Sequence, residues 1–252
     1  MLNISDLTVT VDDKTLLSVD QLSLIEGEMF GVLGKNGAGK STFFKAISND
    51  MPSRGRRLFH QQDMSQWPKQ ALAKHLAVLP QSSQLNFPFS AEEVVSLGLI
   101  PLSISQRGGR ALVKKMMGAT DTAAFAGRLY TSLSGGERQR IHLARVLVQL
   151  SQAEQAPLLL LDEPTSAQDL AQQHHILQLA QQFCRQQKYT ALVILHDINL
   201  SLRYCDRVAM LEQGKLTQCG PPKQILNCEE IEKQWGYQAQ QLTSDSGQIV
   251  FI

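Results

Sequence analysis

Hydrophobic residues in this chain gather in short continuous runs. Runs of strand length occupy residues 29–33, 76–80, 157–162, 191–197 and 207–211. An apolar run of about four to eight residues is typical of a strand that is buried on both faces. Segments with helical spacing separate these runs, so the pattern predicts an α/β fold whose mostly parallel sheet is covered by helices.

Three other regions differ from this alternation. Residues 1–28 have strand-like alternation and turn residues, which predicts an antiparallel β subdomain. Residues 82–150 are mostly helical in spacing and begin with a capping box formed by Ser90 and Glu93, so we expect a helical insertion. The tail, 219–252, has the spacing of one short helix over 222–236 and a final strand over 248–252.

These regions predict a single domain of 252 residues. Residues 1–81 and 151–218 form its nucleotide-binding core, which includes the N-terminal β subdomain. Residues 82–150 form the helical subdomain, and 219–252 form a C-terminal extension. We see no internal repeat, coiled coil or low-complexity segment.

Composition is that of an ordinary soluble protein. The hydrophobic fraction is 43% and the net charge is +1, which argues against nucleic acid as a partner. The N-terminus does not resemble a signal peptide, and no apolar run approaches the roughly 18 residues of a membrane span. The four cysteines lack metal-site or redox spacing, so we expect reduced thiols of a cytosolic protein.

The stretch GKNGAGKST matches the phosphate-binding loop pattern in full. It comprises Gly34, Lys35, Asn36, Gly37, Ala38, Gly39, Lys40, Ser41 and Thr42. Its glycines let backbone N–H groups surround phosphate oxygens, while Lys40 adds a positive charge and the Ser41 hydroxyl can bind Mg²⁺. A predicted strand precedes the loop and a predicted helix follows it, as this kind of site requires.

The apolar strand at 157–162 ends in an acidic residue, Asp162, and a second acidic residue, Glu163, comes directly after it. We expect Asp162 to help hold Mg²⁺ and Glu163 to act as general base toward the attacking water. Gln81 follows the apolar run at 76–80, and His196 stands at the end of the run at 191–197. Gln81 is a candidate to touch Mg²⁺ or water, and His196 to contact the γ-phosphate.

A second candidate anion site lies about a hundred residues after the loop. In LSGGERQRIHLARVL, at 133–147, Ser134, Gly135 and Gly136 stand directly before a run of helical spacing. A helix that begins in this way presents unpaired N–H groups to an anion. One chain therefore carries two predicted phosphate sites.

The ordered set of these motifs resembles the ATP-binding-cassette (ABC) ATPases over at least residues 1–230. The set comprises 34–42, Gln81, LSGGERQR at 133–140, LLLLDEPTSAQD at 158–169, and His196. The resemblance implies ATP and Mg²⁺ as cofactors and ATP hydrolysis as the activity. It also implies a head-to-tail homodimer, in which Ser134, Gly135 and Gly136 of one copy complete the ATP site of the other.

Two positions depart from the family pattern. The family usually has leucine where Gln168 stands, in the loop 166–169 that is expected to meet the partner copy, and we expect only a change in packing. Many members stack adenine on an aromatic residue, but the corresponding position, near Val11, has none. We therefore expect weaker stacking on adenine.

A narrower resemblance points to cargo. LPQSSQLNFPFSAEEVVSLG and HDINLSLRYCDRVAMLEQGKL are similar to cassettes of bacterial iron-chelate, cobalamin and haem importers, with haem importers the most similar. This implies a transmembrane permease as partner, indirectly a periplasmic substrate-binding protein, and a peripheral location on the cytoplasmic face of the inner membrane. A cobalamin or siderophore importer and a soluble iron–sulfur assembly ATPase remain alternatives.

Three apolar residues after Gln81 are candidates for the permease contact or for the core of the insertion. They are Leu85, Phe87 and Phe89. His174 and His175 lie in a glutamine-rich helical segment, and we interpret them as a solvated face rather than as haem ligands.

Overall fold

The computed structural model describes residues 1–81, 85, 87–166, 168–245 and 247–252. Its strands are β1 (Leu2–Val11), β2 (Lys14–Leu24), β3 (Met29–Leu33), β4 (Arg54–Phe59), β5 (Gln62–Asp63), β6 (Leu76–Leu79), β7 (Leu158–Asp162), β8 (Thr190–Ile194), β9 (Arg207–Glu212), β10 (Lys215–Gly220), β11 (Gln241–Thr243) and β12 (Ile249–Phe251). Its α-helices are α1 (Lys40–Ser48), α2 (Lys69–His75), α3 (Ala91–Ser96), α4 (Gln106–Ala119), α5 (Gly135–Leu150), α6 (Leu170–Gln187), α7 (Ile198–Tyr204), α8 (Pro222–Ile225) and α9 (Cys228–Trp235).

One large mixed sheet runs through the molecule, in the order β5-β4-β1-β2-β10-β9-β3-β8-β7-β6. Strands β9, β3, β8, β7 and β6 are mutually parallel, whereas β1 pairs antiparallel with both β2 and β4. The fold class is α/β, as predicted. The N-terminal strands join the same sheet through a short contact of β2 with β10.

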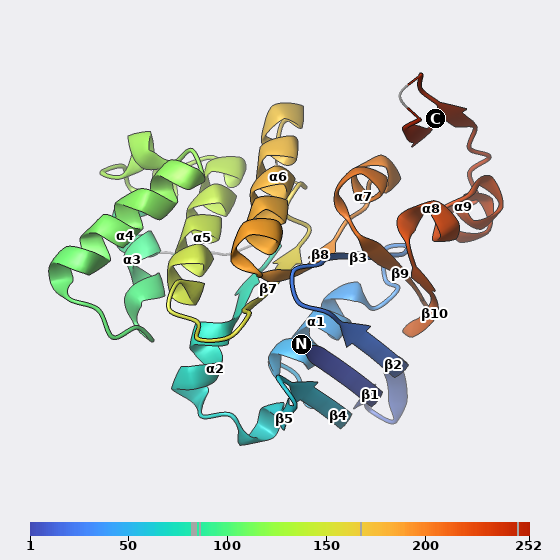
Figure 1. Cartoon of the computed structure of the whole chain (residues 1–252), viewed down its shortest axis with the longest axis horizontal. Helices are drawn as coiled ribbons and strands as arrows, with labels where there is room; N and C mark the ends of the chain where they lie inside the picture. Colours follow the sequence, from blue (N-terminus) through green and yellow to red (C-terminus); the bar gives the residue numbers. More distant parts are fainter. Residues whose placement is uncertain (82–84, 86, 167, 246) are drawn as a thin grey trace.

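Burial explains the central position of the apolar strands. Every residue of β3 and of β8 is buried, so both faces of these strands are covered. Helices α5, α6 and α7 lie on one side of the sheet, and α1 lies on the other, between the parallel strands and the β1–β2 hairpin (Figure 1). These two faces have separate hydrophobic clusters, one of which extends into the helical region.

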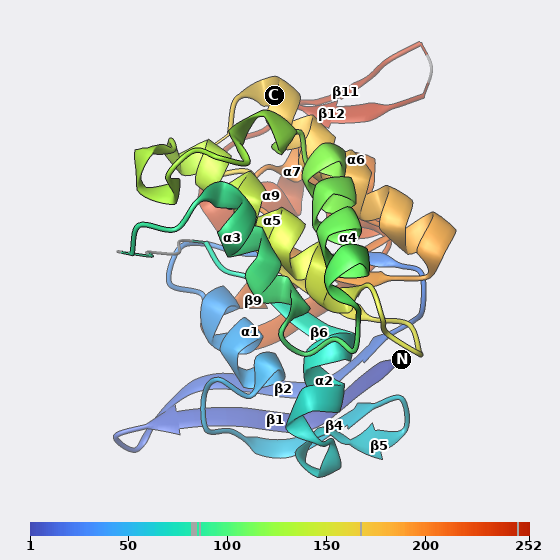
Figure 2. The ribbon, with the colours of Figure 1, turned by 90° about the vertical axis from the view of Figure 1, so that its left-hand side faces the viewer.

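Helices α3, α4 and α5 pack together beside the parallel strands (Figure 2). Ser90 caps α3 with the predicted capping box, because its hydroxyl accepts from the N–H of Glu93 while the Glu93 carboxylate accepts from the N–H of Ser90. Within the described part of the chain, no helix combines the length and the apolar character needed to cross a membrane.

The C-terminal tail differs from its prediction. Two helices, α8 and α9, replace the single expected helix, because Asn227 interrupts the first and caps the second through the N–H of Glu230. The final strand β12 pairs with β11, and the Asn199 side chain of α7 hydrogen-bonds the backbone of Phe251 in both directions, at 2.8 and 2.9 Å. The tail is thus attached to α7.

Candidate nucleotide site

The candidate residues meet at one edge of the sheet. Strands β3, β8, β7 and β6 are neighbours and run in the same direction, so their carboxyl ends lie together. The phosphate-binding loop follows β3, Gln81 follows β6, Glu163 follows β7 and His196 follows β8. In open α/β sheets this edge is where ligands bind.

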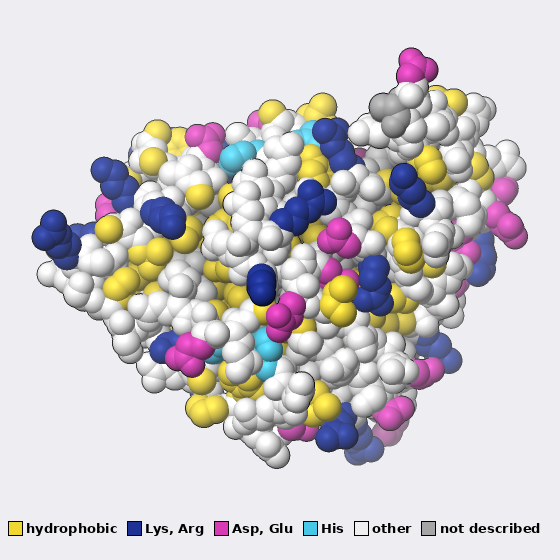
Figure 3. All heavy atoms as spheres, in the orientation of Figure 1, with side chains coloured by type: hydrophobic (Ala, Val, Ile, Leu, Met, Phe, Trp, Pro, Cys, Tyr) yellow, Lys and Arg dark blue, Asp and Glu magenta, His cyan; other side chains and the backbone are white. Residues whose placement is uncertain are grey.

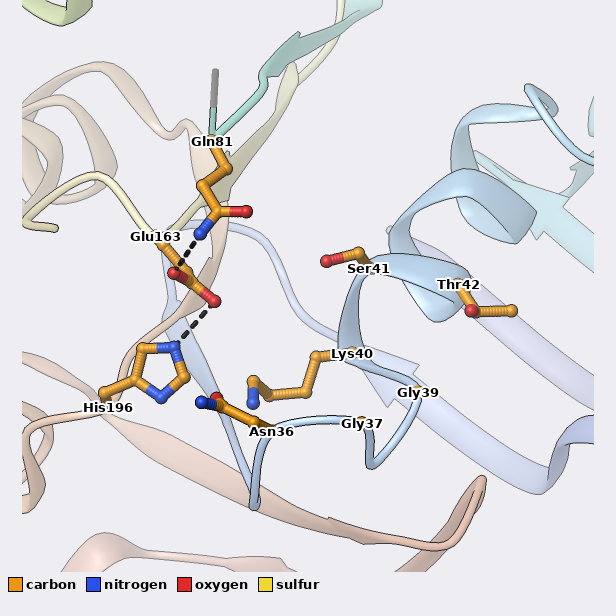
Figure 4. Close-up of a pocket in the computed structure, with 9 residues that line it drawn as sticks. All are labelled: Asn36, Gly37, Gly39, Lys40, Ser41, Thr42, Gln81, Glu163 and His196. Carbon is orange, nitrogen blue, oxygen red and sulfur yellow. Dashed lines mark hydrogen bonds and ion pairs between the residues drawn. The ribbon is translucent and has the colours of Figure 1, made fainter. Parts of the chain in front are cut away.

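A cavity of about 610 Å³ opens at this edge (Figure 4). Its lining residues are Asn36, Gly37, Gly39, Lys40, Ser41, Thr42, Gln81, Glu163 and His196. The loop folds in this way because Gly34 has φ 152°, and a Cβ atom there would lie 2.2 Å from the carbonyl oxygen of Leu211. Any side chain at this position would therefore displace the loop.

Lys40 places a cation inside the loop. Its ammonium donates to the carbonyl oxygens of Gly34, at 2.8 Å, and Lys35, at 3.0 Å, and the side chain is buried. Burial lowers the pKa of Lys40, while the carboxylates of Glu163 and Asp162 oppose that shift. The loop therefore holds a positive charge that phosphate oxygens can compensate.

Asp162 is not among the residues that line the cavity, but its carboxylate is hydrogen-bonded by the hydroxyl of Ser41, which does line it. The other carboxylate oxygen, Oδ1, is buried and has no partner among the described residues. Burial raises the pKa of Asp162, and the neighbouring Glu163 charge adds to the increase. A bound cation would satisfy the unpaired oxygen and oppose both effects.

These oxygen groups fit Mg²⁺. No cluster of three or more His, Cys, Asp or Glu side chains suited to a metal occurs in the described ranges. A metal at Ser41 and Asp162 would therefore need further ligands from phosphate or water, which is how proteins usually hold Mg²⁺ beside a nucleotide.

Glu163 is held between Gln81 and His196. Its Oε2 accepts from the Gln81 amide and its Oε1 contacts His196 Nε2, both at 2.6 Å (Figure 4). The backbone of Glu163 has φ 48°, which is uncommon for a residue with a side chain. The carboxylate is thus fixed at the cavity and faces the phosphate-binding loop.

Three other residues of the predicted loop, Gly34, Lys35 and Ala38, do not line the cavity. Gly34 and Ala38 are buried, whereas Lys35 is exposed. Ser134, Gly135 and Gly136 are also absent from its lining. They form the start of α5, where the Ser134 hydroxyl accepts from Glu137 N–H at 3.3 Å, and the Glu137 carboxylate accepts from Ser134 N–H at 2.7 Å. The second predicted anion site is therefore separate from the cavity of its own chain.

Gln168 and Gln139 are positions whose contacts the sequence analysis missed. We expected Gln168 to change packing only, but its amide makes three hydrogen bonds to α5. Gln139 is buried, and its amide donates to the carbonyl oxygen of Glu163 at 3.1 Å. The signal available in the sequence was the polar side chain of Gln168 at a position where the family usually has an apolar leucine.

Predictions outside the cavity have mixed outcomes. Leu85 and Phe89 are half-buried against the core, whereas Phe87 is 67% exposed. The solvated-face interpretation of the two adjacent histidines is wrong, because His174 Nδ1 lies 2.7 Å from the Tyr204 hydroxyl and His175 Nε2 lies 3.2 Å from the carbonyl oxygen of Ala119. Both rings are half-buried.

Comparison with known proteins agrees with this geometry. The family model described as ABC transporter matches residues 17–166. The hemin import ATP-binding protein HmuV of Shewanella denitrificans is 48% identical, with the alignment covering 100% of both chains. HmuV of Vibrio cholerae is 47% identical over 93% of this chain and 90% of its own. HmuV of Pseudomonas aeruginosa is 45% identical over 94% and 92%.

Solved structures show the same fold. The cbiO1 protein of Clostridium perfringens, part of the ABC transporter complex cbiONQ, is 26% identical with a TM-score of 0.78, covering 93% of this chain and 95% of its own. The dimeric structure of MJ0796, a bacterial ABC transporter cassette, is 24% identical with a TM-score of 0.77, covering 88% and 99%.

Proposed function

Because this chain belongs to the ABC transporter family, we propose that it is the ATP-hydrolysing subunit of a bacterial haem importer. The observation that carries the ATPase part is the placement of Glu163 opposite Lys40 across one cavity. The haem part is supported by full-length relatives named hemin import ATP-binding proteins.

The phosphates of ATP bind the loop 34–42, where Lys40 compensates their charge. Ser41, Asp162 and Gln81 are the residues that would hold Mg²⁺, which neutralises charge on the phosphate oxygens when bound. Glu163 orients a water molecule and accepts its proton as general base. His196 steadies the Glu163 carboxylate through Nε2 and is positioned beside the γ-phosphate.

A homodimer completes the site. Ser134, Gly135 and Gly136 stand outside their own chain's cavity and head a helix of sixteen residues, whose first N–H groups have no intrahelical acceptor. In a head-to-tail pair they would bind the γ-phosphate held by the partner copy. ATP then favours the closed pair, and hydrolysis reopens it.

Transport requires a permease. Phe87, exposed in the segment after Gln81, is our candidate for that contact. A periplasmic substrate-binding protein would deliver haem to the permease, and this chain would lie on the cytoplasmic face of the inner membrane. The alternatives from the sequence, cobalamin or siderophore import and iron–sulfur assembly, lack support from the full-length relatives.

The test of the ATPase is Glu163→Gln, an isosteric change. We expect kcat to fall by about 100-fold or more because the general base is lost, while ATP binding persists. Glu92→Gln, at an exposed position on α3, is the matched control and should keep the wild-type rate. Wild-type turnover in Glu163→Gln would remove Glu163 from its proposed role.

The cargo is tested separately by reconstituting the chain with its co-purifying permease in vesicles. Haem should stimulate ATP hydrolysis, whereas cobalamin and a ferric siderophore should not. Stimulation by either of the latter, without haem, would replace the haem assignment. Recovery of soluble partners alone from detergent-solubilised membranes would contradict transport itself.

A further inference from the structure

The side-chain amide of Gln168 joins the loop after Glu163 to the first turns of α5. Its Nε2 donates to the carbonyl oxygen of Gly136 at 3.0 Å and to Gln139 Oε1 at 2.9 Å. Its Oε1 accepts from Arg140 Nη1 at 3.1 Å. Gln139 and Arg140 are both buried, so these bonds are largely shielded from water.

The Gln139 side chain continues this connection to the active site. Gln139 uses its oxygen to accept from Gln168 and its Nε2 to donate to the carbonyl oxygen of Glu163. That carbonyl also accepts from Ser166, through N–H at 3.2 Å and the hydroxyl at 3.0 Å. Three donors therefore converge on the backbone of the residue whose φ is 48°.

Such a backbone conformation costs free energy and persists only where surrounding contacts impose it. The donor from Gln139 is itself oriented by Gln168, because an amide that receives a bond at its oxygen has its nitrogen placed on the opposite side. Leucine, which the sequence resemblance predicts at 168, has no group that makes any of these bonds. Gln168 therefore orients the Gln139 amide, which a leucine of similar size could not do.

We propose that Gln168 is a positioning residue, which holds Glu163 in its active conformation through Gln139 and ties that conformation to the first turn of α5. The proposal rests on the role of Glu163 as general base in the proposed function. In the proposed dimer, the turn that contains Gly136 also faces the partner's triphosphate. Movement of this turn on nucleotide binding would then change the position of Glu163 in its own chain, through Gln168 and Gln139.

Gln168→Glu is the sharpest test because it is isosteric. The new carboxylate keeps the acceptor for Arg140 but presents an oxygen to the two acceptors on Gly136 and Gln139, so the bonds that orient Gln139 are lost. Gln168→Leu removes all three bonds. We expect kcat to fall about tenfold in both variants with KM for ATP within twofold, because base alignment changes while the phosphate loop does not.

The matched control is Gln149→Leu, on the same helix. Gln149 Nε2 donates to the carbonyl oxygens of Ala73, at 2.8 Å, and Leu76, at 3.2 Å, far along α5 from the site. This variant also loses partly buried hydrogen bonds, and its kcat should stay within twofold of wild type. An equal loss of kcat in the control would mean general destabilisation and would overturn the proposal.

A double-mutant cycle separates positioning from structure. If Gln168 acts through Glu163, adding Gln168→Glu to Glu163→Gln should not lower the residual rate further. An additional tenfold loss, or wild-type kcat in the single Gln168 variants, would contradict the proposal. Wild-type protein that hydrolyses no ATP would instead contradict the proposed function, so the two failures are distinguishable.

Discussion

His142 shows how burial controls a single residue. It lies in α5, is 3% exposed, and its Nε2 is 2.8 Å from the Tyr130 hydroxyl. Its Nδ1 is buried without a partner among the described residues, and no carboxylate compensates a charge on the ring. Burial lowers the pKa of His142 to about 4, with the Arg145 charge contributing. The folded protein therefore keeps this histidine neutral.

The pKa difference predicts acid sensitivity. The unfolded chain binds a proton near pH 6.5, whereas the folded chain binds it only near pH 4. This contribution to stability is complete above pH 6.5 and is lost as the pH falls toward 4. Between pH 7.5 and 5 the loss is about 2 kcal/mol. Urea unfolding at pH 7.5 and pH 5 measures this loss. Between these pH values the free energy of unfolding of His142→Gln should fall by about 2 kcal/mol less than that of wild type. An equal fall in the two proteins would contradict the assignment to His142.

Val11 is the second residue with a testable consequence. It ends β1, is 42% exposed, and stands where the sequence resemblance predicts an aromatic ring. Val11→Tyr should lower KM for ATP about fivefold, since an aromatic contact contributes about 1 kcal/mol. The control is Thr10→Tyr, because Thr10 lines a separate hollow with Thr8, Asp12 and Asp13. The same gain from Thr10→Tyr would show that the effect is not stacking.

At the scale of elements, α3 depends on its N-terminal cap. The helix is six residues long, and three of its residues, Ala91, Val94 and Val95, are buried against the helical core. A helix of this length has little intrinsic stability, and α3 is therefore stabilised by tertiary packing and by its cap. Ser90 supplies the cap through its hydroxyl.

Ser90→Ala should therefore lower the free energy of unfolding by about 1 kcal/mol. Ser96→Ala, in the last turn of the same helix, is the control. The Ser96 hydroxyl only donates back to the carbonyl oxygen of Glu92, at 2.8 Å, a bond that contributes little. Chemical denaturation measures both variants, and equal losses would show that the cap has no special role.

At the scale of the whole molecule, the charged surface does not indicate where a second copy would bind. Lys, Arg, Asp and Glu side chains are interspersed on the face drawn in Figure 3, which is typical of a solvated surface. The proposed dimer depends instead on the start of α5, where Ser134 and the adjacent N–H groups would meet the partner's nucleotide.

Ser134→Arg tests this arrangement, because a large cation at the interface blocks close approach. In the Glu163→Gln background, ATP should shift the parent protein to a dimer in size-exclusion chromatography, and adding Ser134→Arg should abolish the shift. Gln187→Arg, at the exposed end of α6, is the control and should still dimerise. A chain with Ser134→Arg that dimerises with ATP would refute the head-to-tail pair.

Local patterns determined much of this protein without its structure. The glycine spacing and Lys40 predicted the phosphate-binding loop, and the apolar runs predicted β3, β6, β7, β8 and β9 at nearly their observed bounds. Strands β4, β5 and β10 and helix α2 were missed, because their sequences are mixed in polarity and lack strong periodicity. The tail was mispredicted because a single capping residue divides its helix.

Only the tertiary structure decided which distant residues touch. Gln81 and Glu163 are 82 positions apart, yet their side chains lie 2.6 Å from each other because β6 and β7 are adjacent in the sheet. The bonds of Gln168 to α5 also depend on how a loop seats against a helix. Local sequence encodes conformation and burial, whereas these contacts follow from the order and packing of whole elements.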